Sequence, residues 1–282
     1  MMKKILFSMA TALMLLSVFS SCSNDDSKEG SSEFKEQSYS AWSKVVFAYG
    51  AMFDSDETVE VSRSQVTFHS DTWGDGTFTI SEFKRNANGS YELVGTGSLT
   101  MDGHGSKKDY AATVTGTIAQ GSQTFTITVP SVMGGTVLNV TVGEMPLAAA
   151  IDGTYKGGTY ANSKYFQHYQ PTADEKVTIK ANEELTAASL GYTSATWGEF
   201  TFEDVEMVKN TDGTITLTGE GVTLMPSMQG GSKEYAATLE ATVTGKTLVA
   251  TFAVPGVMGG TTIYFNAADF EEVLAEASQE EK

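Results

Sequence analysis

The sequence predicts an all-β protein made of two tandem copies of one small domain. Thr72-Trp73-Gly74 returns as Thr196-Trp197-Gly198, while residues 108–113 and 129–136 return as residues 233–238 and 254–261. The three pairs keep their order and a nearly constant separation, which is typical of a duplicated domain. The repeat is too long for a solenoid unit and long enough for a domain that closes its own core.

Alternation of polar and apolar residues is the second observation behind this fold class. Phe125, Ile127 and Val129 share one face with threonines between them, and residues 250–254 repeat that face. Turn signals such as Asn88-Gly89 separate these runs. Each copy then provides about eight short strands, which suits an up-and-down barrel or a sandwich.

The duplicated segment at residues 129–136 contains a proline and a glycine pair. Proline cannot donate a hydrogen bond to a strand ladder, and glycine relieves the steric limits on φ. We therefore expect a strand end and a turn between antiparallel strands in both copies.

A break in the alternation after each Trp-Gly predicts an irregular strand. The apolar series that ends at Ile80 resumes at Phe83, an odd step, and the second copy has a similar break after Phe202. An odd step turns side chains to the other face unless one residue is extra. We therefore expect a β-bulge or a bend near Ser81 and near Asp204.

Residues 38–53 fit two patterns. Val45, Phe47 and Tyr49 alternate as in a strand, whereas Trp42, Val45 and Tyr49 also fit a helical stripe. Periodicity alone does not decide between helix and strand here.

The N-terminal segment predicts export and a lipid anchor. Lys3-Lys4 precede an apolar run that ends in small residues before Cys22, the only cysteine. This order is typical of a secretory signal peptide. Cys22 resembles the lipidated cysteine of a bacterial lipobox, with Phe19 where that pattern has an aliphatic residue. We expect acyl chains on Cys22 to hold the protein at a membrane.

Acidic residues limit the expected partners. Residues 23–30 resemble the acidic export signal that follows the lipidated cysteine in surface-exposed lipoproteins of Bacteroidetes. The chain has 35 acidic and 18 basic residues, a net charge of −17. Such a surface repels nucleic acid and anionic headgroups. We expect an outer-membrane lipoprotein exposed at the cell surface, with no nucleic-acid partner.

A family resemblance covers the second copy nearly from end to end. Asp152-Gly153-Thr154-Tyr155 opens it, and further motifs follow in order at residues 200–205, 210–219, 245–250 and 257–263. Together they resemble the calycin-like β-barrel domain of Bacteroidetes lipoproteins. The resemblance implies two antiparallel, lipocalin-like up-and-down barrels, and it implies no particular ligand residues. Residues 31–50 lack the Asp-Gly-Thr-Tyr opening, so closure of the first barrel stays open.

These observations divide the chain into six parts. We expect, in order, a lipoprotein signal peptide, an acidic and serine-rich tether, a first barrel, a linker, a second barrel, and a C-terminal amphipathic helix with a tail, at residues 1–22, 23–33, 34–146, 147–152, 153–267 and 268–282. Asp269 and Glu272 have the spacing of a helix capping box.

Trp73 and Trp197 occupy equivalent places and are the candidate ligand-binding residues. Large aromatic side chains also serve as core plugs that seal a barrel end, and the wall of a ligand pocket is the alternative. A second aromatic group comprises Tyr155, Tyr160, Tyr165, Phe166 and Tyr169. Alternate members should face the core, and the others could present a stacking platform for sugars.

Other polar motifs predict no chemistry. Residues 71–82 match a calcium loop in part, but Trp73 stands at a ligand position and too few oxygens are offered. Asp54-Ser55-Asp56-Glu57 reads as a solvated turn. His69, His104 and His168 lack partners at zinc-ligand spacing. We expect no catalytic residue, no metal and no cofactor.

Two hypotheses of function follow for a non-enzymatic protein. In the first, a small apolar ligand binds inside a barrel. In the second, filled barrels contact a glycan or a protein through loops and exposed aromatic residues. A void lined by Trp, Phe and Met would favour the first hypothesis, and packed interiors with exposed tyrosines would favour the second.

Overall fold

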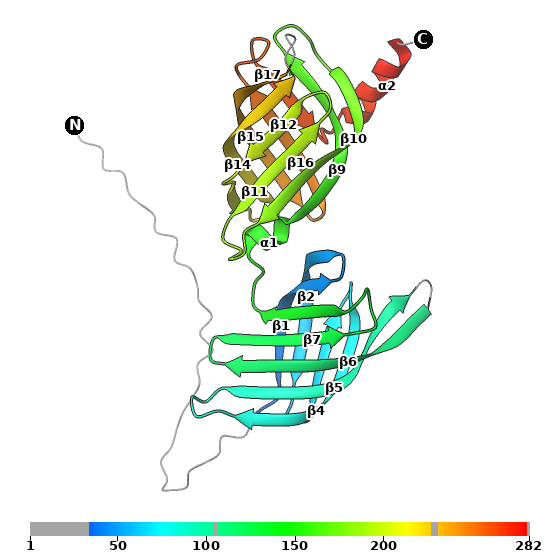
Figure 1. Ribbon diagram of the computed structural model, residues 1–282, viewed down its shortest axis with the longest axis vertical. Coiled ribbons are helices and arrows are strands. Elements are labelled where there is room, and N and C mark those ends of the chain that lie inside the picture. The colour runs from blue at the N-terminus through cyan, green and yellow to red at the C-terminus, as the bar shows by residue number, and fades with distance from the viewer. Residues whose placement is uncertain (1–33, 104–105, 227–230, 281–282) are drawn as a thin grey trace, which may run out of the picture. The chain divides into compact units, whose positions relative to one another are not determined.

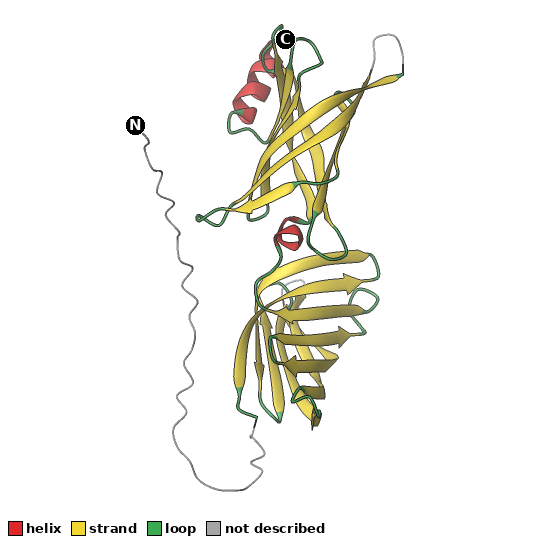
Figure 2. Ribbon diagram, turned by 90° about the vertical axis from the view of Figure 1, so that its left-hand side faces the viewer, coloured by secondary structure: helices red, strands yellow, loops and turns green. Residues whose placement is uncertain are grey.

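Strands make up most of the computed structural model, which describes residues 34–103, 106–226 and 231–280 (Figure 2). Its helices are α1 (Leu147–Ile151) and α2 (Phe270–Glu280). Within these residues, no helix is long and apolar enough to cross a membrane. The predicted signal peptide, Cys22, the tether and His104 lie outside the described residues.

The first copy is a closed antiparallel barrel in which each strand pairs with the next (Figure 1). Its strands are β1 (Gln37–Phe47), β2 (Gly50–Val61), β3 (Gln65–Ser70), β4 (Gly74–Arg85), β5 (Tyr91–Gly103), β6 (Ser106–Ala119), β7 (Ser122–Val129) and β8 (Thr136–Val142). Pairing of β1 with β8 closes the ring. Residues 38–53 therefore belong to two strands joined by a short turn and not to a helix, and the first barrel, whose closure the sequence left open, is closed.

The second copy is the same barrel with one strand added. Its strands are β9 (Gly153–Ser163), β10 (Tyr169–Ala181), β11 (Ala188–Ser194), β12 (Gly198–Phe202), β13 (Glu206–Lys209), β14 (Ile215–Pro226), β15 (Ser232–Thr244), β16 (Thr247–Val254) and β17 (Thr261–Phe265). Pairing of β12 with β14 closes an eight-strand ring, and β13 pairs with β14 beside β12. The expected up-and-down barrels are confirmed in both copies.

Both predicted irregularities are present. In the first copy the register between β4 and β5 shifts between Ile80 and Glu82, which leaves Ser81 as the extra residue of a bulge. In the second copy the chain bends between Phe202 and Glu206, so that one strand becomes the pair β12 and β13. The odd apolar step thus marked a bulge that keeps Ile80 and Phe83 on one face of the first barrel, and a bend in the second.

The duplicated proline–glycine segment forms the predicted turn, between β7 and β8 and again between β16 and β17. Met133 and Met258 lie at its centre with φ of 47° and 48°. This left-handed conformation is unfavourable for a residue with a side chain. The structure therefore adds a feature that the sequence did not reveal, because the strained residue is Met rather than Gly.

All three duplicated segments lie at the same end of their barrel. Successive turns of an up-and-down barrel alternate between its two ends. The β1–β2, β3–β4 and β7–β8 turns therefore share one end, as do the β9–β10, β11–β12 and β16–β17 turns in the second copy. We call this the signature end. The Trp-Gly turn and the proline–glycine turn both belong to it, and residues 108–113 begin beside it.

Two segments outside the strands pack on the second barrel. Residues 147–152, expected as a linker, include α1, whose buried Ala148 and Ile151 belong to the apolar core of that barrel. Helix α2 places Phe270 and Val273 against Tyr160 of β9, so the C-terminal helix expected there is present and packs through an apolar face. The Asp269 carboxylate accepts a hydrogen bond from the Tyr160 hydroxyl at 2.8 Å.

Candidate functional site

Trp73 and Trp197 are buried turn residues at the signature end, 4% and 7% exposed. Each follows a serine that ends the preceding strand. The backbone N–H of Trp73 donates to Ser70 Oγ at 3.0 Å, and the backbone N–H of Trp197 donates to Ser194 Oγ at 3.3 Å. The serine hydroxyl thus holds the turn while the indole enters the core. Burial of both rings matches the plug interpretation more closely than the wall of an open pocket.

A polar layer lies inside the barrels near these tryptophans. Glu57, 1% exposed, accepts a hydrogen bond from Ser43 Oγ at 2.6 Å, and burial raises the pKa of Glu57 to about 8. In the second barrel Glu175 accepts a hydrogen bond from Ser194 Oγ at 2.9 Å, and burial also raises its pKa. Buried carboxyls become harder to ionise because the charged form loses its hydration.

Several buried side-chain atoms have no hydrogen-bond partner among the described residues. They include Glu57 Oε2, Trp73 Nε1, Trp197 Nε1 and Thr223 Oγ1. Unpaired buried polar atoms are rare and costly in folded proteins. Since they occur in both copies, the layer belongs to the barrel architecture and not to one local irregularity.

Side chains otherwise fill the barrel interiors. In the second barrel the Tyr192 ring stacks on Phe200 and Phe252, with centroids 5.5 and 5.1 Å away. In the first, a Cβ placed at Gly116 would lie 2.5 Å from the Phe125 ring, so that this ring occupies the space beside the glycine. An eight-stranded barrel is just wide enough for side chains to fill it. These interiors therefore match the filled-barrel hypothesis.

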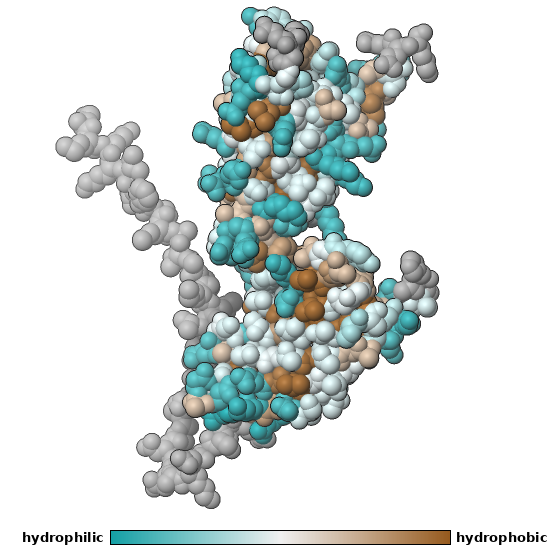
Figure 3. Space-filling view, in the orientation of Figure 1, coloured by the Kyte–Doolittle hydropathy of each residue, from teal (hydrophilic) through white to brown (hydrophobic). Residues whose placement is uncertain are grey.

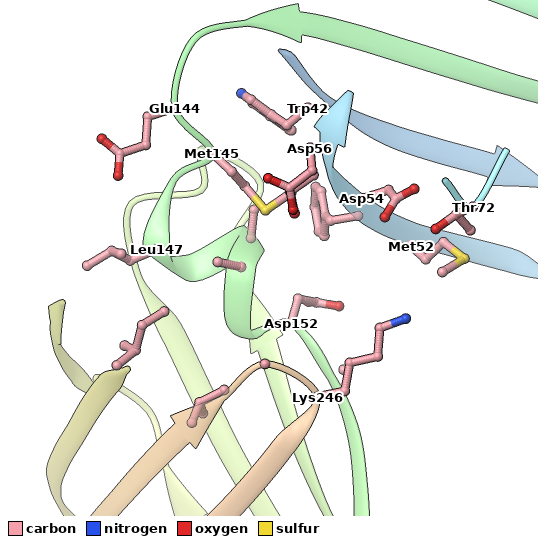
Figure 4. Close-up of a pocket in the computed structure, with 18 of the residues that line it drawn as sticks. Trp42, Met52, Asp54, Asp56, Thr72, Glu144, Met145, Leu147, Asp152 and Lys246 are labelled. Carbon is pink, nitrogen blue, oxygen red and sulfur yellow. The ribbon is translucent and has the colours of Figure 1, made fainter. Parts of the chain in front are cut away.

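One pocket opens outside the barrel interiors, along β2, the segment before α1, and the turns near β9 and β15. Figure 4 shows that its lining combines apolar side chains such as Trp42, Met52 and Met145 with acidic ones such as Asp54 and Asp56. Asp54 also accepts a hydrogen bond from Ser70 Oγ at 3.2 Å. Sequence patterns could not predict this pocket, because its lining comes from segments far apart in the chain.

The other polar candidates form surface contacts. His69 Nδ1 lies 2.6 Å from Asp75 Oδ1. The pKa of His69 is raised because its ring forms a hydrogen bond with the Asp75 carboxylate. Asp71 is almost fully exposed. Among the described residues, no group of three or more His, Cys, Asp or Glu side chains is arranged to hold a metal ion. His168 contacts the Tyr160 ring at 5.2 Å between centroids.

The aromatic segment of the second copy divides between core and surface. Tyr155 and Tyr160 are buried, and Phe166 packs on the core from the β9–β10 turn. Tyr165 and Tyr169 are exposed, and the Tyr169 ring also meets Trp197 edge-on at 6.2 Å. The expected platform is thus reduced to two tyrosines, only one of which stands clear of the core.

An exposed tyrosine beside the strained methionine recurs in both copies. Tyr49 is 87% exposed and Tyr165 is 71% exposed, while Met133 and Met258 are 51% and 45% exposed. The Ala48 N–H donates to the Met133 carbonyl at 3.2 Å, and a Cβ at Gly259 would lie 3.7 Å from the Tyr165 ring. We call these pairs, Tyr49 with Met133 and Tyr165 with Met258, the Tyr–Met tips.

The two tips are equivalent by strand register. Val46 of β1 pairs with Val137 of β8, and Asn162 of β9 pairs with Thr262 of β17. Each tyrosine lies three residues after its paired strand residue, and each methionine lies four residues before the partner. Alignment of the two repeats in the sequence pairs the two methionines. It does not pair the two tyrosines, because the β1–β2 and β9–β10 turns differ in length.

Comparison with known proteins supports the fold. The family model for a calycin-like β-barrel domain matches residues 52–143 and 151–267. A Bacteroides fragilis NCTC 9343 protein, provisionally described as an outer membrane protein, has a crystal structure that matches with TM-score 0.58 and 22% identity, covering 81% of this chain and 95% of that one.

A more distant match is transferrin binding protein B from serogroup B Neisseria meningitidis, with TM-score 0.28 and 10% identity over 82% of this chain and 76% of that one. No curated protein matches the chain. These comparisons identify no enzyme family.

Proposed function

Since the chain belongs to the calycin-like β-barrel domain family, we propose that it is a non-enzymatic, lipid-anchored surface protein whose filled barrels act as interaction modules. The Tyr–Met tips contact a glycan or a protein in this proposal. The lipid on Cys22 holds the chain in the outer membrane, and the acidic tether after it carries the barrels to the cell surface.

The recurrence of the tips is the observation that carries this proposal. Core packing does not require an 87% exposed tyrosine or a methionine at positive φ, yet both copies place the pair at the same register. Backbone strain in a folded protein is often found at functional sites. Tyrosine also provides a large contact area at low cost in conformational entropy. Two equivalent tips in one chain would add avidity for a repetitive partner.

Substitution of the tips tests the interaction role. The chain lacking residues 1–22 would be labelled and incubated with whole cells and with isolated cell envelopes. We expect binding that falls at least tenfold in Tyr49→Ala/Tyr165→Ala, while Tyr91→Ala, on β5 away from the signature end, retains it. Binding that is unchanged in Tyr49→Ala/Tyr165→Ala would contradict the role of the tips.

The anchor is tested separately on the full chain. Metabolic labelling with an alkyne fatty acid should modify the wild type and not Cys22→Ser, and only the wild type should sediment with outer membranes. Protease added to intact cells should degrade the anchored protein if it is surface-exposed. A labelled Cys22→Ser variant would overturn the assignment of this anchor.

A second candidate function is binding of a small apolar ligand, in the pocket outside the barrels and not within them. Trp42, Met52 and Met145 in that pocket favour it. Native mass spectrometry of the chain after incubation with membrane extract would show a discrete added mass that Met145→Glu abolishes. A bare mass against many extracts would remove this candidate.

A further inference from the structure

Threonines form a regular array on the outer face of the first barrel. They are Thr77 and Thr79 of β4, Thr96 of β5, Thr113, Thr115 and Thr117 of β6, Thr124, Thr126 and Thr128 of β7, and Thr141 of β8. All are exposed or half-buried, and their strand neighbours such as Phe78, Val114 and Ile127 point into the core. We call this set the threonine face.

Strand register brings these threonines side by side. Thr79 pairs with Thr96, Thr96 with Thr113, and Thr113 with Thr128, which makes one row across four strands. A second row joins Thr117, Thr124 and Thr141. Rows are separated by about 7 Å for every two residues along a strand, and neighbours within a row by about 5 Å. The face thus presents hydroxyl and methyl groups with a two-dimensional repeat.

The threonine face carries little charge although the chain has a net charge of −17. Figure 3 shows the surface over β5, β6 and β7 mainly in pale colours, with the teal of hydrophilic residues gathered toward its edges. A shallow depression lies on it, lined by Thr115, Thr117, Thr124 and Thr126 together with Glu92, Leu93, Val94 and Gly116. The second row continues into Glu92 and Lys84, so charge stands at the end of the rows and not among the threonines.

The fold does not require this array. Threonine has a high strand propensity, and cross-strand threonine pairs stabilise sheets, which is the ordinary reason for such a residue. The second copy nevertheless builds the same barrel with other residues at matching registers. Thr96 opposite Thr113 corresponds to Glu220 opposite Thr238, and Thr115 opposite Thr126 corresponds to Glu240 opposite Thr251. Thr124 and Thr128 likewise correspond to Val249 and Ala253. Duplication thus supplies an internal control, and only the first copy has the array.

We propose that the threonine face binds an uncharged polysaccharide. Each threonine hydroxyl offers one donor and two acceptors, which complements the hydroxyl groups of sugar units that repeat along a chain. Individual hydroxyl contacts are weak against competition from water, so binding depends on many contacts made at once. The face therefore selects polymers over free monosaccharides. This inference extends the proposed interaction role to a defined partner, but it uses a different surface from the Tyr–Met tips.

The test is affinity electrophoresis of the chain lacking residues 1–22, in gels containing dextran, amylopectin or mannan, with alginate as the anionic polymer. We expect retardation by at least one neutral polymer and none by alginate. The Thr96→Glu/Thr115→Glu variant should lose retardation at least tenfold. It introduces the residues that the second copy carries at these registers, so the barrel tolerates them. Thr238→Glu, at the register of Thr113 in the second barrel, is the matched control and should be retarded like the wild type.

Each other outcome overturns the proposal. Absence of retardation by all three neutral polymers would do so, as would retardation that persists in Thr96→Glu/Thr115→Glu. Cross-linking of a protein to this face without polysaccharide binding would assign the face to a protein partner instead. Tyr49→Ala/Tyr165→Ala should leave retardation unchanged, so that failure of the Tyr–Met tips and failure of the threonine face are distinguished.

Discussion

Glu57 of β2 accepts a hydrogen bond from the Ser43 hydroxyl of β1 at 2.6 Å, inside the first barrel. The other carboxylate oxygen of Glu57 has no partner among the described residues. Burial raises the pKa of Glu57 to about 8, the Ser43 hydrogen bond opposes the rise, and the charge of nearby Asp54 adds to it. The first barrel therefore contains a carboxyl that holds its proton at neutral pH.

This carboxyl predicts that stability falls as pH rises. Below about pH 4.5 the folded and unfolded chains both hold the proton, and between there and pH 8 only the folded chain does. The free energy of unfolding therefore decreases across that window and levels off above it. Urea denaturation at several pH values should show a flatter profile for Glu57→Gln, with a gain of roughly 3 kcal/mol at pH 7.

Glu60→Gln, at an exposed position of the same strand, provides the control for removal of a carboxylate that is not buried. Glu175 adds a second, smaller source of slope because burial raises its pKa too. Equal slopes for the wild type and for the combined Glu57→Gln/Glu175→Gln variant would contradict this account.

Ser70→Ala and Ser194→Ala should each destabilise the Trp-Gly turn. The Ser70 hydroxyl accepts hydrogen bonds from the backbone N–H groups of Thr72 and Trp73. The Ser194 hydroxyl accepts the equivalent hydrogen bonds from Thr196 and Trp197. Loss of such an acceptor costs about 1–2 kcal/mol per variant. Calorimetry should show a lower Tm, and tryptophan fluorescence should shift to the red. Ser122→Ala, at the exposed start of β7, should change neither. Wild-type behaviour of both turn variants would oppose the prediction.

Met133→Gly and Met258→Gly should stabilise the protein while weakening binding through the tips. Both methionines have a left-handed backbone that glycine adopts without steric cost. Relief of this strain should raise the free energy of unfolding by about 1 kcal/mol per site. Chemical denaturation combined with the cell-envelope assay measures both effects. Lower stability in both variants would show that methionine contacts outweigh the backbone strain.

Phe270 and Gly158 should be coupled energetically. A Cβ at Gly158 would lie 2.0 Å from the Phe270 ring, so the glycine leaves room for helix α2 to pack. Phe270→Ala should cost about 3 kcal/mol and free α2 from β9. Gly158→Ala should also destabilise, and the double variant should cost less than the sum of the two. Strict additivity in denaturation experiments, with Glu271→Ala as the surface control, would exclude direct packing.

Local pattern was sufficient for much of the fold. Alternation of side chains has a period of two in any strand, so residues such as Phe125 and Ile127 identified their strand and its buried face without tertiary information. Duplication supplied the domain count, and the odd step between Ile80 and Phe83 identified the bulge at Ser81. The resemblance to calycin-like domains decided between barrel and sandwich, which alternation alone could not.

Tertiary structure decided the rest, because it depends on which strands become neighbours. Pairing of β1 with β8 closed the first barrel. Cross-strand register gathered Thr79, Thr96 and Thr113 into one row. Approach of two turns brought Ala48, the neighbour of Tyr49, to Met133. None of these contacts is local in the chain, so periodicity could not reveal them. The sequence by itself determined the strands and their faces, and only closure of the barrels determined which side chains meet on their surfaces.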